Sequence, residues 1–248
     1  DSVVVANPNE AFTFNREDLK PGLYFLSSGG TRLFDFVVAS ASDSFTVRGS
    51  AARLNTLTAE HSDENTAYFA FEKERKVLEE KITAKEQLLD MVGRATKGDK
   101  DAMQPVQKEL EALYKSGDSL AIAFTKTYPS TLYAQMLLSV RPPEVPKNLK
   151  PTLREKPNPA FTRWQRNHYF DHTDFTDERL LYNNFWHSFF DGFFAQHVVP
   201  KPDSLIRAMD EVIAKMPRNG AFYRFAVMRL VQFFEQNEAP GADRVFVH

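Results

Sequence analysis

Residues 166–181, RNHYFDHTDFTDERLL, carry the side chains of this sequence that come closest to a metal site. His168 and His172 are four positions apart, with Asp171, Asp174 and Asp177 close by. On a helix, this spacing of histidines lets two imidazoles bind one ion. Zinc enzymes with the HExxH pattern also carry a glutamate directly after the first histidine, where this chain has a tyrosine. A metal-dependent enzyme centred on the two histidines is therefore one hypothesis.

A structural role explains the same stretch more simply. The acids lie beyond the expected end of the helix that carries the histidines. We expect Asp174 or Thr176 to cap a short helix at residues 177–181, with Asp177 and Glu178 in the first turn, where the helix dipole favours negative charge. The sequence therefore favours a joint, in which aromatic rings fix the end of one helix against the next and acids cap and solvate the corner.

The rest of the sequence offers no catalytic motif. His187 and His197 border an aromatic stripe, and no G-x-S-x-G elbow accompanies them. The phosphate-binding patterns G-x-x-x-x-G-K-[ST] and G-x-G-x-x-G are missing from the sequence. Cysteine is absent too, which excludes thiol catalysis, thiolate metal ligands and disulfides. We therefore assign no catalytic, cofactor-binding or metal-binding residue and no cofactor, and we do not expect this chain to be an enzyme.

The composition is that of a globular protein. The 248 residues are 42% hydrophobic and 13% aromatic, and the net charge of -2 gives no overall attraction to nucleic acid or anionic lipid. No apolar run is long enough to span a membrane, and the opening residues DSVVVANPNE lack the regions of a signal peptide. We expect a mature or engineered chain from which any leader has been removed.

The chain is expected to begin with a small antiparallel β region at residues 1–60. Apolar residues alternate with polar ones in AFTFN, GLYFLS, TRLFDFVV and SFTVRG, with Gly29 and Gly30 as a hairpin turn. This pattern predicts four or five short strands in one small sheet, whose apolar face must pack on the helices that follow.

Residues 61–248 are expected to form a larger helical domain, so the predicted fold class is α+β. Ser62 or Asp63 caps a long helix with a solvated, charge-rich face at residues 72–86, supported by pairs such as Glu72 with Lys76. A second helix starts at about residue 102 with Pro105 near its first turn, and a shorter one follows residue 129.

The last ninety residues are predicted to form helical hairpins around an aromatic stripe. Core packing is the favoured interpretation of this stripe, with a ligand pocket or a partner groove as the alternative. The helix at residues 220–237 is apolar nearly all round and is expected to lie inside the array. The stripe consists of Phe185, Trp186, Phe189, Phe190, Phe193 and Phe194.

A proline-rich connector at residues 141–159 interrupts the helical region. Its six prolines forbid a continuous helix. Between residues 141 and 166 there are seven lysines or arginines against two glutamates. A nucleic-acid contact is one interpretation of this excess, but no aromatic interleaving supports it, and a solvated linker is favoured.

Taken together, several segments resemble the N-terminal region of bacterial TlpA-like thioredoxin-family thiol:disulfide interchange proteins. The resemblance is carried by LKPGLYFL, DSFTVRGS, SDENTAYFAF, TYPSTLYAQMLL, RNHYFDHTDFTDERLL, KPDSLIRAMDEVIAKM and ADRVFVH. In that group a small β domain and an uncharacterised helical domain precede a thioredoxin fold, whose C-X-X-C pair does the redox chemistry. His172 stands where the similar segment has asparagine, which argues against a metal pair as a family function.

The resemblance implies an exported protein, periplasmic or tethered to the cell envelope by a lipidated N-terminus that has been removed. Our leading hypothesis is a non-catalytic N-terminal region that positions a C-terminal thioredoxin-like domain or engages its envelope client proteins. A self-contained peptide- or glycan-binding helical module is the alternative, and the metal-dependent enzyme is a third. We expect no nucleic-acid partner and no membrane span.

Overall fold

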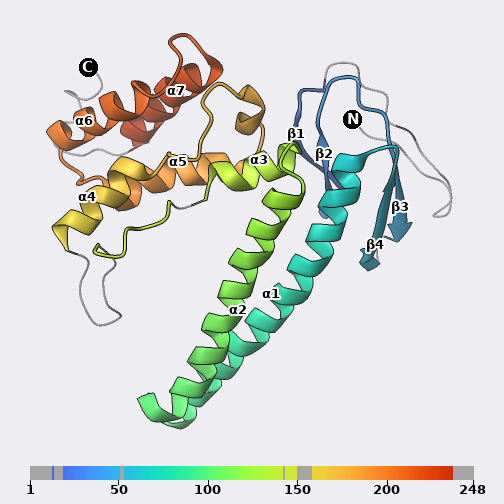
Figure 1. Cartoon of the computed structure of the whole chain (residues 1–248), viewed down its shortest axis with the longest axis vertical. Coiled ribbons are helices and arrows are strands. Elements are labelled where there is room, and N and C mark those ends of the chain that lie inside the picture. The colour runs from blue at the N-terminus through green and yellow to red at the C-terminus, as the bar shows by residue number, and fades with distance from the viewer. Residues whose placement is uncertain (1–12, 14–18, 51–52, 142, 150–157, 237–248) are drawn as a thin grey trace.

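The protein has an α+β fold, in which strands at the N-terminal end precede a larger set of helices (Figure 1). The computed structural model describes residues 13, 19–50, 53–141, 143–149 and 158–236. The first strand expected, at residues 11–15, and the last resembling segment, at 242–248, lie outside these ranges. The described elements are β1 (Gly22–Ser28), β2 (Thr31–Val38), β3 (Thr46–Ser50), β4 (Arg53–Glu60), α1 (Asp63–Ala95), α2 (Lys100–Thr127), α3 (Leu132–Ser139), α4 (Pro159–His168), the 3-10 helix η1 (Glu178–Leu181), α5 (Asn184–His197), α6 (Pro202–Ile213) and α7 (Ala221–Gln236).

The described strands form two separate antiparallel pairs, not the single sheet that the alternation predicts. β1 pairs with β2 through the expected turn, where Gly29 and Gly30 have φ values of 56° and 79°, and β3 pairs with β4. The side-chain amide of Asn65 in α1 bonds both the N–H and the C=O of Val37 at the outer edge of β2. Because a helix side chain occupies this edge, β3 does not extend the first pair.

The apolar face of the first pair packs on α1, as its pattern predicts. Phe34 meets Phe69 edge to face at 6.3 Å between ring centroids, and Val37 is fully buried. The backbone N–H of Leu23 donates to the carbonyl oxygen of Tyr182, which ties β1 to η1. Val37 belongs to the same buried cluster as the helices, so one core crosses the boundary that we predicted at residue 60.

α1 and α2 form a long antiparallel hairpin that extends far beyond the rest of the molecule (Figure 1). Ser62 caps α1, as expected, and accepts from the N–H of Asn65. α2 begins at Lys100, slightly earlier than predicted, so Pro105 lies in the second turn. In these fully described helices the buried side chains all lie at the base: Asn65, Ala67, Tyr68, Phe69 and Phe71 in α1, and Phe124 in α2. We call residues 72–123 the arm.

The two helices of the arm meet along a coiled-coil seam. Gly117 lies against Leu78 and Gly93 lies against Met103, which fixes their relative register. The half-buried seam positions alternate in steps of three and four residues, the spacing of knobs-into-holes packing. They are Arg75, Leu78, Ile82, Lys85, Leu89 and Val92 in α1 and Met103, Val106, Leu110, Leu113, Gly117 and Leu120 in α2.

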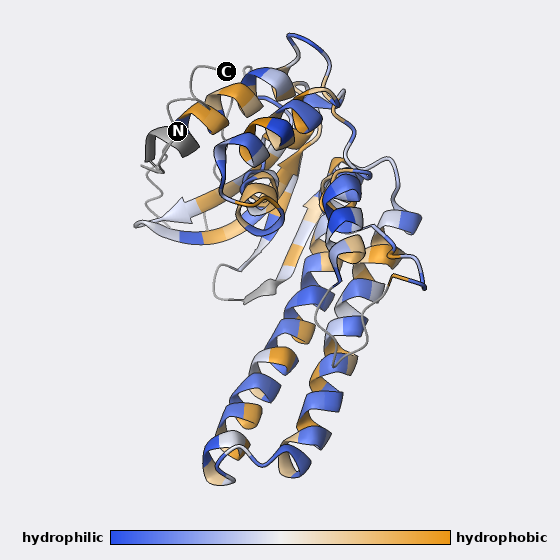
Figure 2. Cartoon of the chain, turned by 90° about the vertical axis from the view of Figure 1, so that its left-hand side faces the viewer, coloured by the Kyte–Doolittle hydropathy of each residue, from blue (hydrophilic) through white to orange (hydrophobic). Residues whose placement is uncertain are grey.

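The remaining helices form an aromatic body beside the base of the arm. In α5, Trp186, Phe190, Phe193 and Phe194 are buried, so the stripe is core, as favoured. The expectation that the last helix lies inside the array is wrong. α7 buries Phe222, Ala226 and Leu230 on one side and exposes an apolar side at the edge of the body. Figure 2 shows hydrophobic residues running through the body and the strands, whereas the arm is largely hydrophilic.

Candidate functional site

The helix required by the metal hypothesis ends at its first histidine. α4 stops at His168, and the chain then turns through hydrogen bonds from the N–H groups of Asp171 and Thr173 to the preceding carbonyls. His172 therefore does not follow His168 on one helical face. The Nδ1 atom of His168 lies 2.6 Å from a carboxylate oxygen of Asp171, and its ring stacks on Trp164 at 4.5 Å. Within the described residues, no three His, Asp or Glu side chains come together as metal ligands.

The acidic residues of this stretch stabilise turns, and the residue that caps η1 is not one of the two predicted. Asp174 accepts from the backbone N–H and the hydroxyl of Thr176, and both bonds hold the pKa of Asp174 below its usual range. The cap of η1 is Asp177, which accepts from the N–H of Arg179 and pairs with its guanidinium. The expectation that Asp174 or Thr176 caps this short helix is wrong. Asp174 instead accepts the hydrogen bonds that close its own turn, and η1 begins at Glu178, one residue later than expected.

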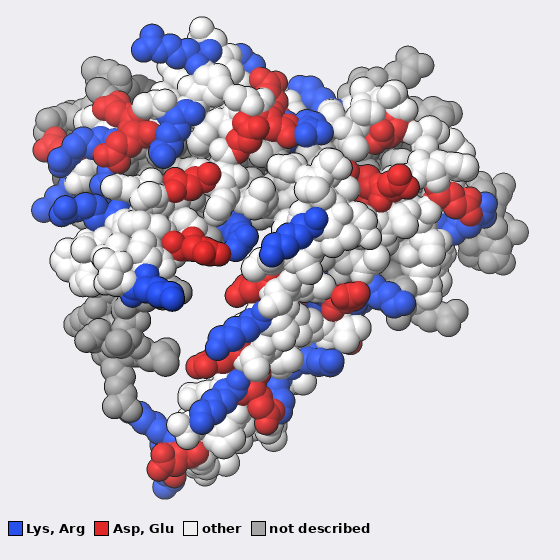
Figure 3. Space-filling view, viewed as in Figure 1, with Lys and Arg blue, Asp and Glu red and all other residues white. Residues whose placement is uncertain are grey.

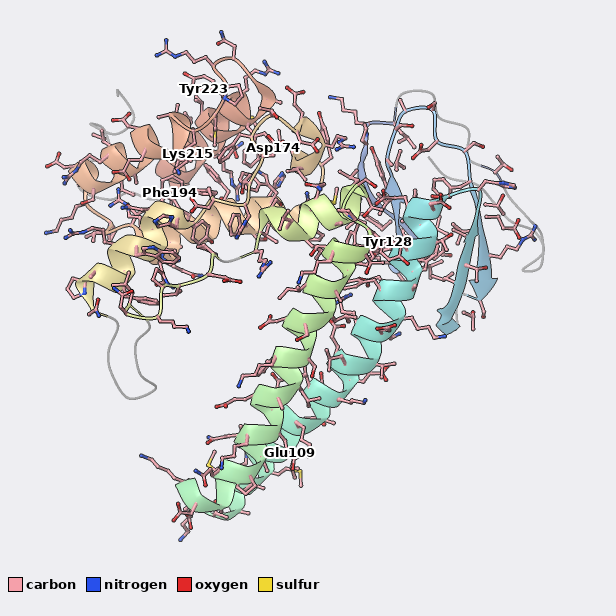
Figure 4. All side chains as sticks on the ribbon, viewed as in Figure 1. Glu109, Tyr128, Asp174, Phe194, Lys215 and Tyr223 are labelled. Atoms are coloured by element: carbon pink, nitrogen blue, oxygen red, sulfur yellow. The ribbon has the colours of Figure 1, made fainter. Side chains whose placement is uncertain are left out.

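The aromatic residues lock α4 against α5, as the joint interpretation predicts. Tyr169 stacks on Phe189 at 4.4 Å between centroids and donates its hydroxyl to the Phe189 carbonyl. Phe170 is buried against Phe193 at 5.0 Å. Figure 4 shows Phe194 on α5 and Asp174 in the loop that leads to η1. The stretch is thus the joint between two packed helices.

His187 and His197, which border the aromatic stripe, also serve packing. His187 stacks on Phe225 of α7 at 4.9 Å. His197, the last residue of α5, lies 4.9 Å from the ring of Tyr169, and burial lowers its pKa from the ordinary value of 6.5. Each imidazole thus contacts an aromatic ring of a neighbouring element.

A polar network at the base of the arm has no counterpart in the sequence pattern. The carboxylate of Glu64 accepts from the N–H groups of Leu132 and Tyr133, at 2.9 Å each, and so caps α3. Burial raises the pKa of Glu64 despite these two bonds. Glu72 binds Arg75 and the Tyr133 hydroxyl, whereas we had expected a pair with Lys76. This network joins α1 to α3, and no local signal could reveal it because the partners are more than sixty residues apart.

The basic segment is only partly described, since residues 142 and 150–157 lie outside the described ranges. At its two ends, Arg141 pairs with Glu144 and Arg166 pairs with Glu211 of α6. These contacts neutralise part of the positive excess at the two ends of the segment.

The arm has an exposed apolar surface that the sequence pattern did not distinguish from the seam between its two helices. Val77 and Leu88 of α1 are 49% and 37% exposed, and Met91 is 65% exposed. They lie away from the seam. A shallow groove of about 550 Å³ follows this side, lined by Lys81, Ala84, Lys85, Leu88, Glu109, Ala112, Leu113 and Ser116.

No protein-family model, curated protein or solved structure matches this chain. The TlpA-like resemblance therefore stays a prediction from short segments. Among the helices of the described residues, none is both long and apolar enough to cross a lipid bilayer.

Proposed function

We propose that this chain is the non-catalytic N-terminal region of an exported thioredoxin-like thiol:disulfide interchange protein. It positions the redox domain or engages that domain's clients. The observation that carries the proposal is the arm, a two-helix projection from an aromatic core. The part of α1 within it, residues 72–95, is about 36 Å long at 1.5 Å per residue. A projection of this length suits a spacer or a docking element.

The absence of cysteine supports this assignment of roles. In an oxidising envelope, a scaffold with free thiols would form mixed disulfides with the C-X-X-C pair of its own redox domain. A chain with no sulfhydryl group leaves that pair free for clients. The proposed partners are the C-terminal thioredoxin-like domain and envelope proteins, and the proposed location is the periplasm or a membrane-tethered position.

An insulin-reduction assay tests whether the redox activity belongs to the downstream domain and not to this chain. The 248-residue chain and a longer natural protein that contains the downstream domain are compared at equal concentration with dithiothreitol as reductant. We expect turnover only from the longer protein, with a C-X-X-C pair encoded downstream of His248. Turnover by the present chain, or a reading frame without that pair, contradicts the proposal.

A second candidate, a peptide- or glycan-binding module, is favoured by the outer side of α7. Val227, Met228 and Val231 are 39%, 56% and 36% exposed and lie together on one helical face. Exposed apolar patches of this kind often mark binding sites. A thermal-shift screen with envelope peptides and sugars tests it. We expect a ligand that raises Tm for the natural chain and fails with Met228→Glu, and no shift with any ligand argues against this function.

A further inference from the structure

The arm has two lateral sides of opposite character. On the side of the groove, Val77, Ala84, Leu88 and Met91 of α1 follow one another at steps of seven, four and three residues, and all four are exposed. The facing part of α2 contributes the small residues Ala112 and Ser116. A two-stranded coiled coil needs apolar residues only at its seam, so this second apolar stripe is in excess of what the hairpin requires.

The opposite side of the arm is polar. The steps of the seam place Glu79, Glu86 and Asp90 there, and the Tyr114 hydroxyl donates to Glu86 across the two helices. Figure 3 shows lysine, arginine and acidic side chains along the arm in the view of Figure 1. One side therefore carries the expected solvated surface, whereas the other exposes apolar side chains of α1 beside the charged residues Lys81, Lys85 and Glu109 that line the groove.

We propose that the apolar side of the arm binds the same side of a second copy, with the two arms antiparallel. A two-fold axis at Ala84 makes most of the stripe self-complementary, although it places Leu88 level with Glu80 of the other copy. Val77 and Met91 lie seven residues to either side of it, so each Val77 meets Met91 of the other copy. Ala112 lies at nearly the same level on α2, because Lys85 pairs with Glu109. Small side chains at the axis let the two helix pairs approach closely.

Area and charge agree with this arrangement. A face about 30 Å long and two helices, or about 20 Å, wide covers on the order of 600 Å² per copy. The total of about 1,200 Å² is the lower limit for a specific interface. Glu109, labelled on α2 in Figure 4, is paired with Lys85, and the long side chain of Lys81, which also lines the groove, can keep its ammonium group in water at the edge of the interface. Antiparallel arms also place the two aromatic bodies at opposite ends of the dimer (Figure 1).

Sedimentation velocity over a concentration series of the 248-residue chain tests the association. We expect a monomer–dimer equilibrium that Ala84→Glu weakens by about tenfold or more, because it buries an unpaired charge. Thr83→Glu is the matched control: the neighbouring residue is also exposed but lies toward the polar side, and this variant should dimerise like the natural chain. A monomer throughout the series, or equal effects of the two variants, overturns the proposal and leaves the stripe to a different partner.

Disulfide trapping tests the register, and the absence of natural cysteine makes it specific. A mixture of Val77→Cys and Met91→Cys chains should form a mixed dimer on oxidation. Neither variant alone should cross-link efficiently, because equivalent positions are about 21 Å apart along antiparallel arms. Lys76→Cys with Asp90→Cys, on the polar side, is the control pair. Equal yields from the two mixtures overturn the arrangement. This self-association does not depend on the proposed redox domain, so either proposal can fail alone.

Discussion

At the scale of single residues, the side chain of Asn65 makes the hydrogen bonds to Val37 that a neighbouring strand would otherwise make at this edge of β2. Its side chain is fully buried, accepts from the N–H of Val37 at 2.7 Å and donates to the Val37 carbonyl at 2.8 Å. The same amide nitrogen also donates to the hydroxyl of Ser62. One side chain thus satisfies both backbone groups of Val37 on an edge that none of the described strands covers, while linking that edge to the start of α1.

Replacing Asn65 by alanine should cost about 2–4 kcal/mol of unfolding free energy, because two buried backbone groups lose their partners. Urea denaturation followed by circular dichroism measures this change. Asn167→Ala, at an exposed position of α4, is the control and should change stability by less than about 0.5 kcal/mol. Similar midpoints for the two variants would show that water replaces the amide at Val37.

His197 should make stability depend on pH. Burial lowers its pKa in the folded state, so the unfolded chain binds a proton more readily. Its contribution is present above the ordinary pKa of 6.5 and is lost as the pH falls below that value. We therefore expect His197→Gln and His197→Phe to flatten the fall in unfolding free energy between about pH 7 and pH 5. Curves for the natural chain and both variants that run parallel over this range would contradict the assignment.

At the scale of elements, the sequence predicts what local patterns determine. The helical period, the cap at Ser62 and the glycine turn between β1 and β2 depend on neighbouring residues, and all three predictions are confirmed. Asn65 and Glu64 were missed because their partners lie 28 and 68 residues away. Asn65 also occupies the edge of β2 at which a third strand could pair. Because this contact is distant in sequence, local patterns could not predict the division of the strands into two pairs.

Two glycines should respond in opposite directions to alanine. At Gly117, in the seam of the arm, an added Cβ would lie 3.5 Å from Leu78, an ordinary contact, so Gly117→Ala should stabilise α2 by about 0.5–1 kcal/mol. At Gly22 it would lie 2.7 Å from the Tyr182 Cβ and 2.8 Å from its carbonyl oxygen. Gly22→Ala should therefore destabilise by about 1–3 kcal/mol.

Thermal unfolding monitored at 222 nm measures both substitutions, and hydrogen exchange locates the change in the arm or in the strands. The Gly22→Ala substitution also tests how closely β1 packs against η1. A neutral Gly22→Ala would mean that β1 does not rest closely on η1, in conflict with the hydrogen bond from Leu23 to Tyr182.

At the scale of the whole molecule, the chain combines one aromatic core with one projection. Rings from four elements meet at Tyr133 of α3, which contacts Tyr68 of α1, Phe124 of α2 and Phe185 of α5. The core is therefore continuous from the strands to the last helix. Sequence patterns identified both long helices but could not show that they leave the core, because a seam between two helices and a buried face have the same periodicity.

Removing the arm should leave the core folded. Deleting residues 79–116 and joining Leu78 to Gly117 by a short glycine-rich turn connects two residues that already touch. Every buried side chain of α1 and α2, both fully described, lies outside the deleted segment. We expect near-ultraviolet circular dichroism and cooperative unfolding like those of the natural chain, with reduced helical signal and no dimer. A shortened chain without a cooperative transition would show instead that the seam stabilises the core, since the tyrosine and phenylalanine contacts at the base would then depend on the arm's continued length.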